Sequence, residues 1–335
     1  MGLQRPLPED TCDVTTADDD LPAASRQMTS SFLTDVLTGL SAPLKQVPPK
    51  YFYDEAGSHL FDRICELPEY YVTRTELGIL QDSAADMAQA LGPGVLLIEP
   101  GSGNSAKISL LLAQLQDPVG YVPVEISGEH MLASLEAVRA QFPDLEILPV
   151  CDDFTAPFTV PTSSRAPSRR VVFFPGSTLG NFPPHDAVEL LRSFHEVAGP
   201  DGALLLGADL RKAPEIVLPA YDDSAGVTAA FNRNLLVRMQ RELGADLDAD
   251  AFRHQAVWND AESRIEMHLV STAAQTIRVG GQCFEFAAEE PIVTEYSYKY
   301  TRERLAGLAT EAGFRVAQVW TDAREWFSVQ LLTRN

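Results

Sequence analysis

The sequence predicts an α/β protein built on a doubly wound parallel sheet, with a second lobe. Three observations support this prediction. Short, continuously apolar runs alternate with helical segments between residues 75 and 210. A glycine-rich turn joins the first apolar run to the helix after it, and beyond residue 210 the alternation gives way to other patterns. Continuous apolar strands that alternate with helices are typical of a parallel sheet covered on both faces.

Length and charge narrow the class of protein. The chain has 335 residues, 45% of them hydrophobic, so it can bury a sizeable core as one large domain or two ordinary ones. A net charge of −21 disfavours nonspecific binding to nucleic acid or anionic lipid. No apolar run approaches the length of a membrane span. We therefore expect a cytoplasmic monomer that binds a small molecule, with no nucleic-acid or membrane partner.

The N-terminus predicts no targeting signal, and the cysteines predict no metal or disulfide site. Residues 1–25 are acidic and lack an apolar signal region, so we expect a disordered leader. Four cysteines are scattered, without a C-x-x-C pair or a histidine at ligand spacing; they are Cys12, Cys65, Cys151 and Cys283. This pattern predicts reduced thiols, with neither a metal site nor a disulfide framework.

The elements of the parallel sheet follow in chain order. Helical spacing covers 30–46 and 58–66, and a helix from 75 onward ends at Gly92 and Pro93. The predicted strands are 94–100, 120–126, 145–151, 170–176 and 202–210, and the predicted helices between them are 105–115, 128–142 and 184–199.

The last third of the chain predicts a different arrangement. Residues 213–245 are helical in pattern, whereas 262–300 alternate and contain a Gly280–Gly281 turn, which favours antiparallel strands. A helix over 301–313 and strands over 314–322 and 326–334 complete the chain. We therefore expect one domain from 75–210 and 300–335, and a second lobe from 26–74 and 211–299.

A candidate ligand motif lies where the first strand meets its helix. Glu99, Gly101 and Gly103 form an E-x-G-x-G pattern. Glycines here let the backbone turn sharply and approach a ligand at a helix N-terminus. Ala106 stands where dinucleotide-binding proteins have a third glycine, so tight packing against a pyrophosphate is disfavoured. The acidic Glu99 instead favours a cationic ligand.

Acidic residues also end the next two strands. Glu125 follows Gly103 by a little over twenty residues and suits both hydroxyls of a ribose. Asp153 and Phe154 end the third strand, where a carboxylate and a ring suit the edge and face of an adenine. Three acids at successive strand ends favour S-adenosylmethionine, whose sulfonium is positive. The alternative is that Glu125 and Asp153 are helix caps. Lys107 is either a partner for the ligand's carboxylate or a surface lysine.

Several longer blocks carry a family resemblance. The blocks are "YFYDEAGSHLFDRICELPEYYVTRTE", "IEPGSGNSAK", "FFPGSTLGNF", "AYDDSAGVTAAFNRNLL" and "TEYSYKY". The chain resembles, over roughly residues 30 to 335, the S-adenosylmethionine-dependent L-histidine Nα-methyltransferases of ergothioneine biosynthesis. The resemblance implies a Rossmann-like class I methyltransferase domain and a substrate-binding lobe, matching the organisation predicted above.

The resemblance also implies a set of contact residues. The implied cofactor contacts are Gly101, Lys107, Glu125, Asp153 and Phe154. The implied substrate contacts are Tyr53, Tyr70, Gly176, Asn181, Tyr221, Glu295 and Ser297. Glu125 departs from the family by one methylene, because aspartate is frequent at the ribose position.

Each implied substrate contact suits a physical role. Asn181 and the Tyr221 hydroxyl can donate to the substrate carboxylate, and the Gly176 carbonyl can accept from the amine. Glu295 and Ser297 lie two apart, so on a strand they face one side and can hold the two imidazole nitrogens. A further pair, Tyr53 and Tyr70, is expected to close over the ring, whereas Tyr51 and Tyr71 are expected to pack. Tyr53, Gly176 and Asn181 are expected to position the reacting amine, and no side chain is assigned as a base.

Alternatives remain for the blocks and for the function. Taken alone, 175–181 could be an ordinary turn, 294–300 an alternating strand, and Tyr221 a half-buried tyrosine. The implied activity is three methyl transfers to histidine, giving trimethylhistidine (hercynine) and S-adenosylhomocysteine. One rival is the same chemistry on another aromatic amino acid such as tryptophan, whose single indole donor would leave Glu295 poorly satisfied. Another is a catalytically silent sensor of an adenosyl ligand.

Overall fold

The computed structural model describes residues 23–103, 105–126 and 128–334. The predicted leader, 1–25, lies outside the described residues except for its last three positions, which begin helix α1 (Ala23–Leu40). Cys12 also lies outside them.

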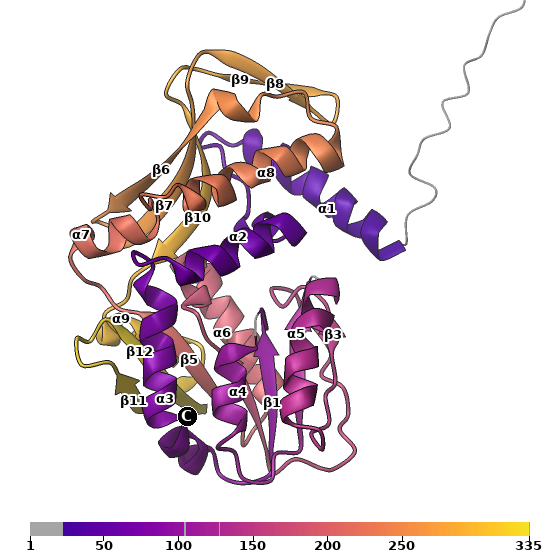
Figure 1. The fold of residues 1–335 in the computed structure, drawn as a ribbon, viewed down its shortest axis with the longest axis vertical. Helices are drawn as coiled ribbons and strands as arrows, with labels where there is room; N and C mark the ends of the chain where they lie inside the picture. The colour runs from indigo at the N-terminus through magenta and orange to yellow at the C-terminus, as the bar shows by residue number, and fades with distance from the viewer. Residues whose placement is uncertain (1–22, 104, 127, 335) are drawn as a thin grey trace, which may run out of the picture.

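A seven-stranded, mostly parallel sheet forms the centre of the larger part of the molecule (Figure 1). Its strand order is β11-β12-β5-β4-β1-β2-β3. Strands β1 to β5 run parallel, and β12 runs antiparallel to both of its neighbours. The strands are β1 (Val95–Pro100), β2 (Gly120–Glu125), β3 (Val150–Cys151), β4 (Arg169–Phe174), β5 (Ala203–Asp209), β11 (Phe314–Thr321) and β12 (Phe327–Arg334). The predicted α/β fold with a doubly wound sheet is confirmed.

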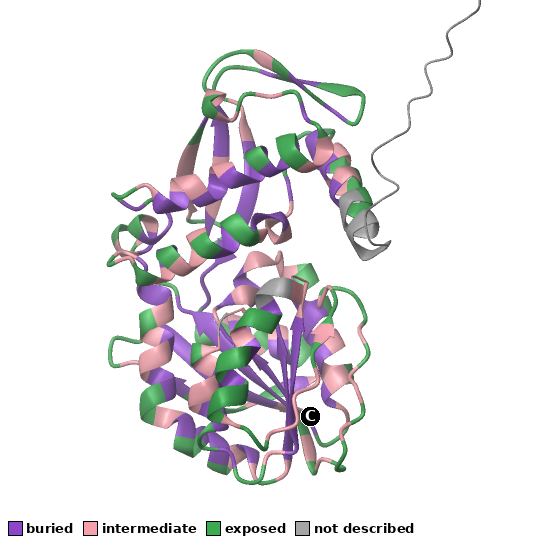
Figure 2. Cartoon of the chain, turned by 45° about the vertical axis from the view of Figure 1, so that its right-hand side comes forward, coloured by how far each residue is buried: buried purple, intermediate pink, exposed green. Residues whose placement is uncertain are grey.

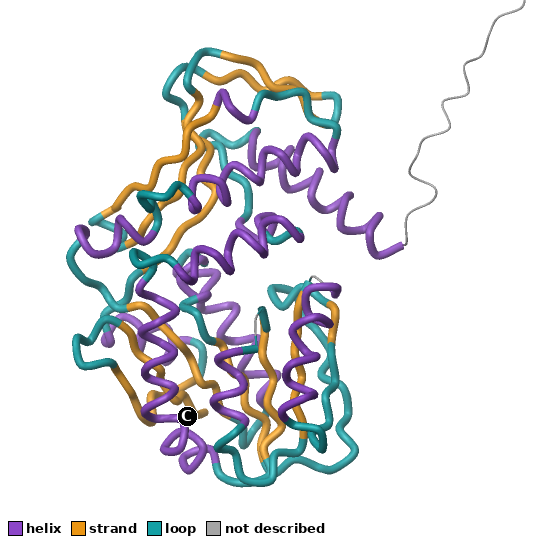
Figure 3. Tube along the Cα trace, in the orientation of Figure 1, coloured by secondary structure: helices purple, strands orange, loops and turns teal. Residues whose placement is uncertain are grey.

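Helices cover both faces of this sheet (Figure 3). One face packs against α3 (Tyr71–Leu91), α4 (Ala106–Leu112) and α5 (Gly128–Gln141). The other packs against α6 (Pro184–Ala198) and α9 (Arg302–Glu311). Adjacent residues of β4 divide between the two cores, with Phe173 in one and Phe174 in the other. Burial on both faces explains why these strands are continuously apolar, and Figure 2 shows them buried between helices with exposed outer sides.

Two predicted boundaries were wrong. The helix expected over 30–46 ends at Leu40, and Pro43 follows shortly afterwards. The strand expected over 145–151 is reduced to Val150–Cys151, with one isolated bridge between Tyr121 and Ile147. Pro149 explains this shortening, because a proline has no N–H to donate to a neighbouring strand.

The other strands form a three-stranded antiparallel sheet and a separate hairpin. The sheet has the order β10-β7-β6 and consists of β6 (Phe252–Asn259), β7 (Arg264–Ser271) and β10 (Pro291–Tyr298). The hairpin pairs β8 (Gln275–Val279) with β9 (Gln282–Phe286). Its predicted turn at Gly280 and Gly281 is confirmed, and both glycines have positive φ. Strand β6 was not predicted.

Segments far apart in the sequence surround the small sheet (Figure 1). They are α1, α2 (Glu55–Glu66), α7 (Pro214–Val217) and α8 (Val227–Leu243). Gln46 forms a parallel bridge to Val293 of β10, so the N-terminal segment is joined to this sheet. Leu210 bridges Tyr300, where the chain leaves and re-enters the larger unit. The functional division into two lobes stays a prediction.

In the part of the chain that the structure describes, no helix has the length and apolar character needed to cross a membrane.

Candidate active site

A cavity of about 410 Å³ lies where the carboxyl ends of the parallel strands meet the small sheet and the N-terminal segment. The structure brings every residue of the predicted site to the wall of this cavity. On the cofactor side these are Gly101, Lys107, Glu125, Asp153 and Phe154, and on the substrate side Tyr53, Tyr70, Gly176, Asn181, Tyr221, Glu295 and Ser297. Their individual roles stay predictions.

The glycine-rich turn after β1 lets the backbone approach the ligand space closely. Gly101 and Gly103 have φ values of +68° and +44°, a region that other residues rarely adopt. A Cβ at Gly101 would lie 3.2 Å from the Phe154 ring. A side chain there would therefore fill the space between the turn and that ring. Helix α4 begins directly afterwards, at Ala106.

Glu99 is a buried carboxylate at the end of β1. It is 1% exposed and accepts a hydrogen bond from the Tyr121 hydroxyl. Burial raises the pKa of Glu99 to about 8, although Tyr121 and Lys107 both favour the ionised form. A cationic ligand near Glu99 would stabilise its negative charge.

Glu125 and Asp153 combine local hydrogen bonds with a place on the cavity wall. Glu125 accepts from the backbone N–H of Ile126 at 2.9 Å and, at 3.4 Å, from that of Gly103. Asp153 accepts from the backbone N–H of Thr155 at 2.9 Å. These bonds fix the two carboxylates at successive strand ends.

Lys107 is tied to a buried glutamate that was not among the predicted residues. The Lys107 ammonium lies 2.7 Å from Oε2 of Glu76, which is fully buried on α3. The backbone N–H of Gly176 donates to both carboxylate oxygens of Glu76, at 3.0 and 2.9 Å. Glu76 therefore fixes one residue of each half of the site. It stands in a quoted block, but its side-chain contacts could not be found from sequence order.

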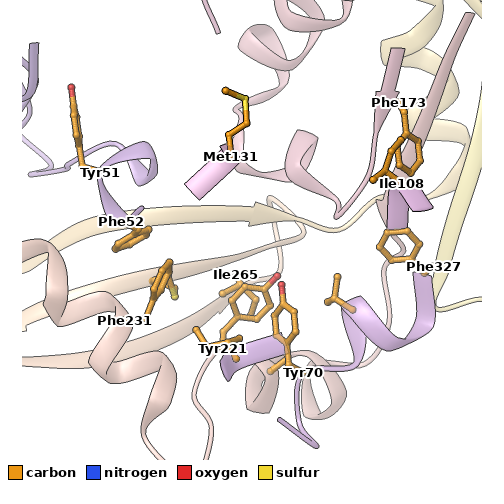
Figure 4. Close-up of a cluster of buried hydrophobic side chains, with 14 of the residues drawn as sticks. Tyr51, Phe52, Tyr70, Ile108, Met131, Phe173, Tyr221, Phe231, Ile265 and Phe327 are labelled. Carbon is orange, nitrogen blue, oxygen red and sulfur yellow. The ribbon is translucent and has the colours of Figure 1, made fainter. Parts of the chain in front are cut away.

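Aromatic rings form one wall of the substrate half. Tyr70 lies between Phe61 and Tyr221, with centroid distances of 6.3 and 6.2 Å, and Tyr53 lies 5.6 Å from Phe61. Figure 4 shows Tyr70 and Tyr221 side by side. Edge-to-face contacts of this kind favour a defined ring arrangement. The rings therefore give this part of the cavity a rigid apolar surface.

Tyr53 is held in place by its neighbour in the chain. The side chain of Asp54 caps α2 by accepting from the backbone N–H of Gly57 at 2.8 Å. It also accepts from Asn234 of α8 at 2.7 Å. These bonds attach the start of α2 to α8 and thereby place Tyr53 at the cavity.

Glu295 and Ser297 lie on β10 and face the cavity together. Glu295 is 9% exposed, and burial raises its pKa to about 7, with Lys299 opposing the shift. The Ser297 and Tyr221 hydroxyl oxygens lie 2.8 Å apart. The strand periodicity correctly predicted a shared face.

Lys299 continues this strand face and was missed by the sequence analysis. Its side chain is fully buried and lies 2.8 Å from Oδ2 of Asp209, the last residue of β5. Lys299 follows Ser297 by two positions, so the alternation that placed Glu295 and Ser297 could have indicated it as well.

The two tyrosines expected to pack are buried, and each also makes a hydrogen bond. Tyr51 is 5% exposed and donates to Asp35 at 2.7 Å. Tyr71 is 4% exposed and donates to Asp209 at 2.7 Å. Neither belongs to the cavity wall.

The cofactor half has the chemistry that an adenosyl ligand with a positive sulfonium requires. Acidic residues end β1 and β2 and follow β3, and the turn at Gly101 leaves room beside the Phe154 ring. The sheet has one antiparallel strand, β12, between β5 and β11. Fold and site together define a class I, S-adenosylmethionine-dependent methyltransferase.

The match to protein families makes the class more specific. Residues 32–334 match the family described as "Histidine-specific methyltransferase, SAM-dependent". The chain belongs to this family.

Curated relatives agree with the family. The chain is 43% identical over 307 residues to a histidine N-alpha-methyltransferase of Mycolicibacterium smegmatis, covering 90% of this chain and 94% of the relative. It is 40% identical over 306 residues to the protein of that name in Mycobacterium tuberculosis, with the same coverage. It is also 29% identical over 314 residues to ergothioneine biosynthesis protein 1 of Neurospora crassa, covering 87% of this chain and 33% of that protein.

Proposed function

We propose that this protein transfers methyl groups from S-adenosylmethionine to the α-amine of L-histidine. Three successive transfers give Nα,Nα,Nα-trimethylhistidine, or hercynine, for ergothioneine biosynthesis. One observation carries the proposal: Glu295 and Ser297 share a cavity with the glycine-rich turn and the acidic strand ends. The family and its histidine-methylating relatives support the same acceptor.

The cofactor half would hold the adenosyl ligand by its polar ends. Glu125 would accept from the ribose hydroxyls, and Asp153 with Phe154 would hold the edge and face of the adenine. Lys107 would bind the ligand's carboxylate by exchanging part of its bond to Glu76. When bound, S-adenosylmethionine supplies an electrophilic methyl group.

The substrate half would orient histidine by three groups of contacts. Glu295 accepts from one imidazole nitrogen, and Ser297 bonds the other. Asn181 and the Tyr221 hydroxyl donate to the carboxylate. The remaining contacts, Tyr53, Tyr70 and the Gly176 carbonyl, confine the ring and the amine, and Glu76 fixes the Gly176 peptide through its N–H.

The chain's residues contribute mainly by positioning. The α-amine must lose its proton before it attacks, and we assign no side chain as the base. Holding the amine in line with the methyl group can contribute about 7 kcal/mol or more to lowering the barrier. Repeated transfer requires space for a dimethylated amine to turn back towards the methyl donor within the same cavity.

We also propose the division of labour between the two parts of the chain. Residues 75–210 and 300–335 would bind the cofactor, and 26–74 with 211–299 would form the substrate lobe. The expectation of a monomer belongs to the same proposal.

Mass spectrometry tests the acceptor directly. The purified protein is incubated with S-adenosylmethionine and either L-histidine or L-tryptophan. We expect histidine to gain three methyl groups and tryptophan none. Methylation of tryptophan alone would retain the enzyme class and overturn the imidazole assignment. Methylation of neither would favour a protein that only binds the adenosyl ligand.

A further inference from the structure

A buried ion cluster lies directly behind the substrate wall. It consists of Asp209 at the end of β5, Lys212 three residues later, and Lys299 just after β10. The Lys299 ammonium lies 2.8 Å from Oδ2 of Asp209, and that of Lys212 lies 2.5 Å from Oδ1. One carboxylate and two ammonium groups leave the cluster with one net positive charge.

All three hydrogens of the Lys299 ammonium have acceptors. The group donates to Asp209, to the Tyr221 hydroxyl at 2.7 Å and to the Ser297 hydroxyl at 2.9 Å. An ammonium group has three donors and no acceptor. Each hydroxyl oxygen therefore receives a hydrogen from Lys299 and must turn its own hydrogen elsewhere.

The two hydroxyls share one further hydrogen bond. Their oxygens are 2.8 Å apart, and either can be the donor. Only one hydrogen fits between two oxygens at this distance, so one hydroxyl donates to the other. The second hydroxyl keeps a hydrogen for another acceptor, and both Tyr221 and Ser297 line the cavity.

We propose that Lys299 is a positioning residue: by orienting the Tyr221–Ser297 pair, it makes the Tyr221 hydroxyl a hydrogen-bond donor to the α-carboxylate of the substrate. The proposal rests on the proposed function, because it takes an amino acid as the ligand. The positive cluster and the remaining O–H both favour an anion at this point of the wall. Glu295, on the same strand face, disfavours an anion at its own end. The amino acid is thereby held in one orientation.

Lys299 keeps its charge over the whole working range of pH. Burial alone would lower its pKa, but the charge of Asp209 and the hydrogen bonds to Asp209 and Tyr221 outweigh burial and raise the pKa above the ordinary value of lysine. Its role is therefore to orient the hydroxyls and not to remove the proton of the substrate amine.

A pair of substrates that differ at the carboxylate, compared between the wild-type protein and its variants, tests the role of Lys299. L-Histidinamide replaces the carboxylate by a neutral amide of similar size. We expect the wild-type protein to prefer histidine in kcat/KM. In Lys299→Met this preference should fall about tenfold or more, because the hydroxyl is no longer oriented to donate a hydrogen bond to the charged carboxylate. A preference that stays within twofold of wild type would overturn the proposal.

Lys212→Met is the matched control. It removes the same charge from the same carboxylate, but Lys212 bonds Tyr71 and a backbone carbonyl and has no bond to Tyr221 or Ser297. We expect it to retain the preference for histidine. Equal losses in both variants would indicate a general field of the cluster and would overturn the hydroxyl-orienting role.

Binding of S-adenosylhomocysteine reports whether each variant is folded. If Lys299→Met fails to bind it, Tyr221→Phe provides the test, because it removes the hydroxyl through which Lys299 acts and keeps the ion pair with Asp209. A Tyr221→Phe protein that keeps the wild-type preference would overturn the proposal, and loss of the preference would support it. Histidine left unmethylated by the wild-type protein would overturn the proposed function itself.

Discussion

The two walls of the cavity are built in different ways. The cofactor wall comes from loops that follow successive strands of one sheet, and its shape depends on backbone turns such as the one at Gly101. The substrate wall joins segments far apart in the chain, and side-chain bonds hold it together. The bond from Lys299 to Tyr221, for example, spans 78 positions of the sequence. We therefore expect the two walls to respond differently to substitution.

Each wall contains one buried carboxylate, and the two differ in their surroundings. Glu99 has a raised pKa of about 8 and accepts from the Tyr121 hydroxyl. Glu295 has a raised pKa of about 7, with the charge of Lys299 opposing burial. A ligand donor is thus expected to matter more at Glu295, where protein donors contribute less to holding the charge.

Asp209 joins the large sheet to the substrate wall, so its loss should have the largest effect on the stability of the whole molecule. It ends β5 of the large sheet and bonds Lys299 behind the substrate wall. Asp209→Asn leaves two buried ammonium groups without a carboxylate. We expect the free energy of unfolding to fall by about 3–5 kcal/mol, as measured by chemical denaturation.

An exposed ion pair provides the control for Asp209. Asp260 lies 2.9 Å from Arg211, and both side chains are well exposed. Asp260→Asn should change stability little, because exposed pairs contribute little. If both variants lost equal stability, the buried cluster would contribute no more to stability than an exposed ion pair.

Glu295→Ala should separate the walls most clearly in activity. It removes the acceptor expected to bind the imidazole, and a buried charge partner contributes about 2–5 kcal/mol to binding. We expect kcat/KM for histidine to fall about 100-fold or more while the affinity for S-adenosylmethionine, measured by calorimetry, is retained. Glu290→Ala, at a partly exposed glutamate just before β10, is the control and should leave both quantities unchanged. If Glu295→Ala weakened the use of histidine and the binding of S-adenosylmethionine equally, the assignment of Glu295 to the imidazole would be wrong.

The same contrast explains what the sequence could and could not predict. Strand ends and glycine turns follow chain order, so Glu99, Gly101 and Glu125 could be placed from spacing alone. The substrate residues entered through the family resemblance. Glu76, Asp209 and Lys299 were missed, because their importance lies in contacts between distant elements.

The predictions of β3 and β6 were wrong for local reasons. Pro149 shortens β3, since it cannot donate to the sheet. Strand β6 escaped prediction because most of its residues are only half-buried, so its sequence, "FRHQAVWN", lacks a clear apolar alternation. It is recognised as a strand only by its pairing with β7.

Gly101→Ala should disturb the cofactor wall and leave the substrate wall unchanged. The new Cβ would lie 3.2 Å from the Phe154 ring, in a turn whose φ is +68°. We expect the affinity for S-adenosylmethionine to weaken about tenfold or more, because overpacking must displace the ring. Gly199→Ala is the control, since it has a φ of +75° but open space around the added carbon. If both variants weakened binding equally, backbone strain and not the contact with Phe154 would be responsible.

The pH dependence of histidine binding should sharpen the contrast at Glu295. Its pKa is raised to about 7, so the carboxylate that accepts an imidazole N–H forms as the pH rises through 7 and is lost below it. At pH 6 about a tenth of the Glu295 carboxyl groups are ionised. Ionisation of Glu295 alone should therefore make the affinity for histidine about tenfold lower at pH 6 than at pH 8. The affinity for histidine at each pH is measured by calorimetry with S-adenosylhomocysteine present. Glu295→Gln is the reference, because the titration of histidine itself is common to both proteins. If the affinity of the wild-type protein and that of Glu295→Gln changed in the same way with pH, Glu295 would not bind the imidazole.

Substitution of Lys50 should have the smallest effect on ligand binding, because Lys50 lies on the cavity wall and is one-third exposed. Its ammonium is 3.2 Å from Asp35 and 3.5 Å from Asp153 at the cofactor wall. S-Adenosylmethionine carries a net positive charge, so Lys50→Met should strengthen its binding, by about threefold or less. The difference should shrink at high salt. Arg165→Met, in an exposed pair with Asp117, is the control and should change nothing. Weaker binding after Lys50→Met would mean that Lys50 contacts the ligand and that the cofactor wall includes the N-terminal segment.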